Sequence, residues 1–186
     1  LLKWAKLGTN INVNYTNRNA RNNNIFTKAL GAFPLGQVRD ANGNINVQFS
    51  DGEVTPLGDE IPDQYADNTR STFGFLNTYL ELAPLDGLSL RSNVGITLNN
   101  NRQGRYFGKQ STALPPSGYA LPVATLDNYF GYGYTWENTL TYNRVIAADH
   151  NVTLTGITSW ADSRFDRNNS LGQGQDLDYY LFYNIG

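Results

Sequence analysis

The sequence contains no cysteine and no methionine, and its single histidine is His150. The absence of cysteine excludes a disulfide framework, a cysteine-ligated metal or iron–sulfur site and a thiol nucleophile. One histidine excludes a multi-histidine metal site and leaves little material for a serine–histidine–aspartate catalytic machine. We therefore expect no enzyme, no metal and no cofactor.

Charged residues are also scarce. Lys and Arg number 14, Asp and Glu number 16, and together they form 16% of the chain. The formal net charge of -2 and the absence of a basic cluster argue against a nucleic-acid partner. Soluble domains usually carry roughly 25% charged residues. Here Asn, Tyr and Gly take their place, which is unusual for a cytosolic surface.

Long apolar runs are missing as well. No stretch approaches the length of a transmembrane helix, which needs about 18 apolar residues or more. The chain begins Leu1-Leu2-Lys3-Trp4, without an initiator methionine or the features of a secretory signal. We therefore expect residues 1–186 to be a segment of a longer polypeptide.

What the sequence does contain is alternation of apolar and polar residues with a period of two, which is typical of β-strands with two different faces. In the first case Leu7, Ile11 and Val13 share one face, while Asn10 and Asn12 share the other. The pattern predicts six strands, at about residues 4–15, 72–82, 88–98, 134–145, 152–160 and 176–185.

The predicted connections alternate in length. Short turns are expected at 83–87, where Pro84 and Asp86-Gly87 have turn chemistry, and at 146–151. Longer polar links are expected at 16–71, 99–133 and 161–175. Long structureless loops are uncommon in compact soluble domains. Short turns alternating with long loops are typical of outer-membrane β-barrels, whose turns are periplasmic and whose loops are extracellular.

The two faces of the strands support the same interpretation. The polar faces carry mainly Asn, Thr, Ser and Gly rather than the many charges of a solvated sheet, as expected for a wet lumen. The predicted lumen-facing residues are Lys6, Asn10, Asn12, Glu81, Arg91, Asn93 and Glu137. The predicted lipid-facing residues are Leu7, Ile11, Val13, Leu80, Leu90, Val94, Ile96, Leu140 and Leu154.

Six strands cannot close a transmembrane barrel, since the smallest have about eight. An open edge in lipid leaves backbone groups without hydrogen-bond partners, at a cost of several kcal/mol each. We therefore predict an all-β fold: an antiparallel arc of about six strands from a larger barrel.

Particular segments carry a family resemblance. Residues 4–12, 79–95 and 136–144 resemble strand–turn–strand blocks of the SusC/RagA family of TonB-linked outer-membrane transporters, and 150–156 and 176–186 resemble the strands that follow. The segment Asp40-Ala41-Asn42-Gly43-Asn44 is similar to an extracellular hairpin of that family. The resemblance spans essentially the whole chain in order, except in the long loops.

This resemblance implies a barrel of roughly 22 strands closed by a plug. It also implies a SusD-like surface lipoprotein as partner and energy delivered through TonB by way of an N-terminal region absent from the sequence. The implied cargo is an oligosaccharide or a peptide, and the implied location is the outer membrane of a Gram-negative, Bacteroidetes-like bacterium. Residues 1–186 would be part of the barrel wall, with the N-terminal extension, plug and remaining barrel lying elsewhere.

Aromatic residues in the predicted loops are candidates for substrate contact, because rings stack on sugars and grip peptide side chains. The candidates are Tyr106, Phe107, Tyr119 and Tyr129.

Three alternatives remain open. The chain could be a soluble all-β glycan-binding or adhesin module, whose apolar faces would be buried between two sheets. Asp40, Asn42 and Asn44 resemble the start of a calcium loop, but the expected Gly is Ile45 and the expected Glu is Asp51, so a polar hairpin turn is favoured. Glu81 and Glu137 could form a glycosidase pair, although isolated lumenal charges are ordinary in barrels.

Overall fold

The computed structural model describes residues 4–31, 36–47, 55–114, 121–147 and 149–185. Five β-strands dominate it. They are β1 (Ala5–Asn19), β2 (Tyr65–Leu85), β3 (Leu88–Phe107), β4 (Val123–Ile146) and β5 (His150–Gln173). Three short helices complete the described part: α1 (Ile25–Gly31) and the 3₁₀ helices η1 (Pro56–Glu60) and η2 (Asp178–Tyr183).

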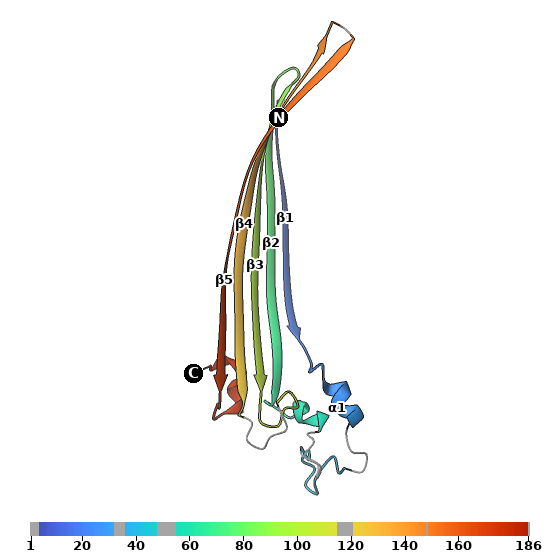
Figure 1. Ribbon diagram of the computed structural model, residues 1–186, viewed down its shortest axis with the longest axis vertical. Coiled ribbons are helices and arrows are strands. Elements are labelled where there is room, and N and C mark those ends of the chain that lie inside the picture. The colour runs from blue at the N-terminus through green and yellow to red at the C-terminus, as the bar shows by residue number, and fades with distance from the viewer. Residues whose placement is uncertain (1–3, 32–35, 48–54, 115–120, 148, 186) are drawn as a thin grey trace. The chain divides into compact units, whose positions relative to one another are not determined.

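The strands form one antiparallel sheet in the order β1-β2-β3-β4-β5, so that each strand pairs with its neighbours in the sequence (Figure 1). The predicted all-β, antiparallel fold is thus confirmed. Two tight turns join strands: one at Asp86 and Gly87, the other between β4 and β5. Gly87 has a φ of 81°, a left-handed conformation that glycine adopts without the steric penalty of a side chain.

The prediction of a sixth strand at 176–185 is wrong. This segment contains η2 instead, and Leu181 has a φ of 50°, which is incompatible with an extended strand. Phe182 is buried and lies directly against Gly104, where an added Cβ atom would overlap the Phe182 ring. Packing of this aromatic-rich segment onto β3 therefore replaces the expected strand pairing.

The strands are also longer than predicted. β2 to β5 have 21, 20, 24 and 24 residues, and they take in parts of all three predicted links. A strand needs only about 9–11 residues to cross a bilayer. The extra residues of β2, β3 and β5 are rich in Asn, Asp, Arg and Gly and lack the apolar alternation by which the other strand segments are predicted. In β4, Phe130 and Tyr132 continue that alternation beyond the predicted start of the strand.

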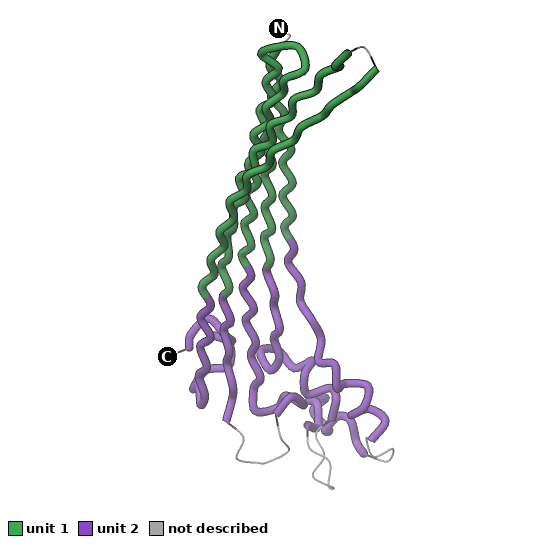
Figure 2. Tube along the Cα trace, turned by 45° about the horizontal axis from the view of Figure 1, so that its top comes forward, with its two compact units in different colours: residues 1–15, 71–100, 129–166 green, residues 16–70, 101–128, 167–186 purple. Residues whose placement is uncertain are grey.

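The chain divides into two compact units, coloured separately in Figure 2. Unit 1 consists of Leu1–Tyr15, Ser71–Asn100 and Tyr129–Asp166. It contains both tight turns and the part of each strand that the sequence predicts. The register within unit 1 is visible in paired side chains, such as Thr9 with Thr78 (Oγ1–Oγ1 3.3 Å) and Trp136 with Ser92 (Nε1–Oγ 2.9 Å).

These pairs define an apolar face of unit 1, the face that carries Leu7, Ile11, Leu80, Leu90 and Val94. The predicted lipid-facing residues are all exposed, from 37% for Ile96 to 73% for Leu7. The soluble-module alternative requires a second sheet over them. The described residues form one sheet only, and it leaves this face uncovered.

Unit 2 consists of Thr16–Arg70, Asn101–Asn128 and Arg167–Gly186. It contains the three helices and a small core of Tyr106, Ala124 and Phe182. Ala66, Leu181 and Ile185 pack against this core. Unit 2 therefore has an interior of its own, formed where η2 covers β3 and β4.

We expect Gly87→Ala to destabilise the β2–β3 turn by about 1–3 kcal/mol, because an alanine would be held at positive φ. Its Cβ atom would also overlap the carbonyl oxygen of Asn143. Gly156→Ala is the matched control, since nothing lies within 4 Å of the added methyl group. Urea unfolding of both variants in detergent tests the prediction. Equal midpoints would contradict it.

Candidate functional site

The second face of unit 1, which we call the polar face, carries a hollow of about 720 Å³. Strands β2 to β5 all contribute to its lining. The lining residues are Phe75, Gly95, Thr97, Asn99, Tyr129, Gly131, Tyr132, Gly133, Tyr134, Thr135, Ala161, Asp162, Ser163, Arg164 and Phe165. Most of these belong to the alternate positions that form the polar face.

Two aromatic rings dominate the hollow. Tyr129 of β4 and Phe165 of β5 stack with their ring centroids 5.9 Å apart and their planes inclined by 22°. The Tyr129 ring lies over Gly131, where a Cβ atom would come within 2.7 Å of the phenolic oxygen. A glycine at position 131 is therefore required for this ring to lie down along the strand.

A charged cluster occupies the polar face near the β2–β3 turn. Lys6 Nζ lies 3.4 Å from Glu81 Oε1, and Arg91 Nη1 lies 3.8 Å from Glu81 Oε2. The Arg91 guanidinium also lies over the Tyr79 ring, 4.2 Å from its centroid. Three of the predicted lumen-facing residues are thus brought together. Glu81 is paired with two positively charged side chains, an arrangement that is typical of a charge cluster with a structural role.

The other predicted lumen-facing residues do not join this cluster. Asn10, Asn12 and Glu137 are exposed. The side-chain oxygen of Asn93 is buried and has no hydrogen-bond partner among the residues that the structure describes.

Unit 2 contains an ion pair that the sequence does not predict. Arg167 of β5 donates to both carboxylate oxygens of Asp127 of β4, at 3.1 and 2.5 Å. The hydrogen bonds from Arg167 hold the pKa of Asp127 below its usual value, and those bonds raise the pKa of Arg167. Both residues lie in predicted links, so no strand alternation places them on adjacent strands.

A second unpredicted feature of unit 2 is a carboxylate that joins three loop segments, which we call the Asp59 node. Asp59 Oδ1 accepts hydrogen bonds from Ser111 Oγ at 2.6 Å and from the Thr112 amide at 2.9 Å. Its Oδ2 accepts from Thr112 Oγ1 at 2.6 Å and from Asn22 Nδ2 at 2.9 Å. Ser111 and Thr112 are buried. The node therefore supplies partners for groups that water does not reach.

The four predicted substrate-contact aromatics have different positions. Tyr129 lines the hollow on the polar face. Phe107 lies at the end of β3 and stacks on Tyr65, with centroids 5.6 Å apart. Tyr119 lies outside the described residues. Tyr106 is fully buried and donates to Asp178 Oδ1 at 2.5 Å, so its ring is packed inside unit 2 and not presented to a ligand.

The calcium alternative has no support in the geometry of Asp40. Its Oδ1 accepts from the amides of Asn42 and Asn44 at 2.9 and 2.8 Å, and its Oδ2 accepts from Asn44 Nδ2. These bonds lower the pKa of Asp40 and form a polar hairpin turn, with Gly43 at a φ of 83°. Among the described residues, no group of three or more His, Asp or Glu is placed to bind a metal ion.

Comparison with known proteins finds a relative in sequence and two in fold. No protein-family model matches the chain. In sequence, the chain is 27% identical over 161 residues to TonB-dependent receptor P26 of Formosa agariphila; the match covers 83% of this chain and 16% of the receptor. The chain therefore spans about a sixth of the length of that relative.

Two solved structures have the same fold. They are the RagAB peptide transporter and the RagAB peptide importer in its closed-closed state, each with a TM-score of 0.67. Sequence identity is 18% and 17%, and each match covers 96% of this chain and 20% of the solved chain. The fold is thus that of a segment of a RagAB-type barrel. The sequence match adds similarity to a TonB-dependent receptor, in agreement with the SusC/RagA resemblance.

No described helix has the length and apolar character required to cross a membrane.

We expect Asp59→Ala to loosen all three segments of the Asp59 node together, because it leaves buried donors of Ser111 and Thr112 without a partner, at about 2–4 kcal/mol. Limited proteolysis with mass spectrometry should then show increased cleavage near Asn22, η1 and Ser111. Asp40→Ala is the control, since Asp40 bonds only within its own hairpin. Faster cleavage at a single segment would contradict the prediction.

A second prediction concerns Tyr106. Burial, followed by the hydrogen bond to Asp178 and the charge of Asp178, raises the pKa of Tyr106 above its usual value. The fold therefore favours the neutral phenol, and this contribution is complete below about pH 10 and is lost as the pH rises further. We expect Tyr106→Phe to reduce stability by about 0.5–1.5 kcal/mol at neutral pH. The difference from the unmodified protein should shrink at about pH 11. Urea unfolding at both pH values tests this, and parallel stability curves would contradict it.

Proposed function

We propose that the chain is a wall segment of the β-barrel of a TonB-dependent transporter in the outer membrane of a Gram-negative, Bacteroidetes-like bacterium. The observation that supports this proposal most strongly is a single sheet with one exposed apolar face and one polar, hollowed face. Stable soluble domains rarely expose large apolar patches, so an uncovered apolar face of this kind is not expected in one.

In this proposal the apolar face of unit 1 contacts lipid. Leu7, Ile11 and Val13 are 67–73% exposed and follow one another along β1. Trp136 and Trp160 are on the same face, where amphipathic rings suit a membrane–water interface. Trp160 donates to the Tyr134 hydroxyl at 3.2 Å.

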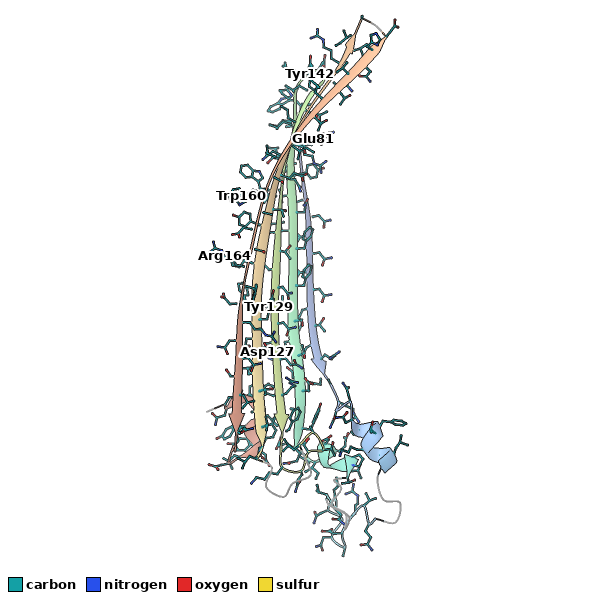
Figure 3. All side chains as sticks on the ribbon, in the orientation of Figure 1. Glu81, Asp127, Tyr129, Tyr142, Trp160 and Arg164 are labelled. Carbon is teal, nitrogen blue, oxygen red and sulfur yellow. The ribbon has the colours of Figure 1, made fainter. Side chains whose placement is uncertain are left out.

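On the lipid-facing side of β1 and β5, the apolar residues end and polar or charged residues follow. On β1, Tyr15 is followed at the same face by Asn17 and Asn19. On β5, Trp160 is followed by Asp162 and Arg164, which lie 3.5 Å apart, and Figure 3 shows Trp160 and Arg164 on the same side of the strand. The apolar stretch of β1, from Ala5 to Tyr15, is about as long as the 9–11 residues needed to cross a bilayer. We place the outer membrane surface at this change.

The polar face of unit 1 would then line the lumen, with Lys6, Glu81 and Arg91 near one end and the hollow around Tyr129 beyond them along the strands. We assign the chain no catalytic step. Its role is to form part of the passage, and the proteins to which it is similar are named as a receptor and a transporter.

Other parts of the proposal extend beyond the chain. A plug, the remaining barrel strands and a TonB-contacting segment would complete the transporter. A SusD-like lipoprotein is the proposed partner, and an oligosaccharide or a peptide the proposed cargo. The name of the Formosa agariphila relative supports the TonB connection, and the two-component name RagAB supports a partner.

We expect Ile11→Arg to prevent stable assembly in the membrane, because an arginine on the lipid face near the bilayer midplane costs about 2–4 kcal/mol. Asn12→Arg is the matched control: it introduces the same side chain one residue further along β1, on the polar face. The measurement is the amount of heat-modifiable protein in outer membranes containing the full-length polypeptide. Equal losses in both variants, or a full-length polypeptide that stays monomeric in water without detergent, would contradict the proposed function.

A further inference from the structure

We propose that the hollow on the polar face of β3, β4 and β5 binds a neutral sugar unit of an oligosaccharide. This inference rests on the proposed function, because it takes the ligand to be the cargo of the barrel. It adds a site and a chemical class of cargo. Three features of the hollow support it: an aromatic platform, a floor made of backbone, and a rim of neutral polar side chains.

The aromatic platform consists of Tyr129 and Phe165. Their offset stack, with planes inclined by 22°, extends the aromatic surface across two adjacent strands. Phe165 is 69% exposed, although it lies on the polar face and not on the lipid-facing one. An aromatic ring face carries partial negative charge, and the C–H groups on one side of a sugar ring carry partial positive charge. A large exposed ring on a lumenal wall is therefore suited to stack on a sugar.

The floor of the hollow contains Gly95, Gly131 and Gly133. The first two are covered: a methyl group added at Gly131 would lie 2.7 Å from the Tyr129 phenolic oxygen, and one added at Gly95 would lie 2.7 Å from the Thr135 hydroxyl. Gly133 differs, because the nearest atoms to such a methyl group are Ser163 Cβ at 3.4 Å and Asp162 O at 3.5 Å, which are ordinary contacts. A methyl group would thus fit over Gly133 in contact with β5, and a larger side chain there would occupy this part of the floor.

The rim offers neutral groups. Thr97, Asn99, Thr135 and Ser163 supply hydroxyl and amide groups, which both donate and accept hydrogen bonds as sugar hydroxyls do. Among the described lining residues only Asp162 and Arg164 are charged. Both residues occupy the same alternate positions of β5 as Trp160, and Arg164 Nε lies 3.5 Å from Asp162 Oδ2, so that the two charges are paired with each other. A charged ligand would find in this described lining only two charges that are already paired with each other.

A peptide fits the hollow less well. Extended peptides commonly bind by adding a strand to a free sheet edge. The hollow lies on the face of the sheet, and three of the four strands that line it, β2, β3 and β4, are paired on both sides. Peptide termini and charged side chains would also have to compete there with the ion pair between Asp162 and Arg164. The chain thus differs from what the name of the RagAB peptide transporter would suggest for a cargo.

The test uses the full-length polypeptide in detergent and isothermal titration calorimetry. The probes are maltohexaose, cellohexaose, xylohexaose, mannohexaose and laminarihexaose, with an oligogalacturonate and a serine–glycine hexapeptide blocked at both ends as comparisons. We expect at least one neutral oligosaccharide to bind more tightly than both comparison probes. Gly133→Leu, which fills the floor, and Phe165→Ala, which removes half of the platform, should each weaken that binding by at least about tenfold.

The controls are Gly156→Leu and Leu154→Ala, substitutions of the same kind on the opposite face of β5. Both should leave the affinity unchanged. Tyr129→Phe keeps the ring and should reduce the affinity by less than about threefold. A Ser163→Cys variant should react with a small maleimide in the intact protein, and bound oligosaccharide should slow that reaction.

Four results would overturn the inference. They are no binding of any neutral hexasaccharide, tighter binding of the anionic probe or the peptide, equal affinity in Gly133→Leu and Gly156→Leu, and a Ser163→Cys thiol that another part of the polypeptide shields from maleimide. Failure of the proposed function looks different, since the full-length polypeptide would then be soluble without detergent. A heat-modifiable membrane protein with no sugar bound at this hollow would refute the inference alone.

Discussion

Backbone hydrogen bonding between adjacent strands is the constraint on which the rest of the structure depends. Hydrocarbon offers no partner to an amide or a carbonyl, so every polar backbone group at membrane depth must be paired with a neighbouring strand. Each of β2, β3 and β4 has a neighbour on both sides, while β1 and β5 form the two margins of the sheet. Once strands are paired in this way, successive side chains point to opposite faces of the sheet. One face can therefore contact lipid while the other contacts water.

Alternation explains why much of unit 1 can be predicted from the sequence. Leu7, Ile11 and Val13 are separated by even numbers of residues, which places them on one face of a strand. Asp86-Gly87 is a dipeptide that is typical of tight turns between strands. Both signals are local, so no knowledge of distant contacts is needed. The same reasoning fails where side chains are polar on both faces. The added ends of β3 and β5, at 99–107 and 161–173, resemble loops in sequence because Asn, Asp, Arg and Gly there replace most apolar residues of the pattern.

Periodicity along the sequence does not predict contacts between residues that are far apart in it. Arg167 meets Asp127 across 40 positions, and Thr112 meets Asp59 across 53. Nothing near either residue in the sequence marks its partner. The hollow is predicted in part. Tyr129 and Phe165 both lie in predicted links, and only Tyr129 is among the candidates, because nothing in the sequence shows that these two links pair as β4 and β5. For 176–185, the aromatic composition favours a strand, but burial of Phe182 against Gly104 stabilises a different conformation.

The Asp59 node has a consequence for how the three segments that it joins can change during evolution. The carboxylate of Asp59 accepts hydrogen bonds from two other stretches of chain, one at Asn22 and one at Ser111 and Thr112, and so joins three stretches that are far apart in the sequence. A substitution, insertion or deletion in one stretch therefore alters the hydrogen bonding of the other two. The three segments are therefore expected to change together during evolution. Transferring them to another barrel would require moving all three at once.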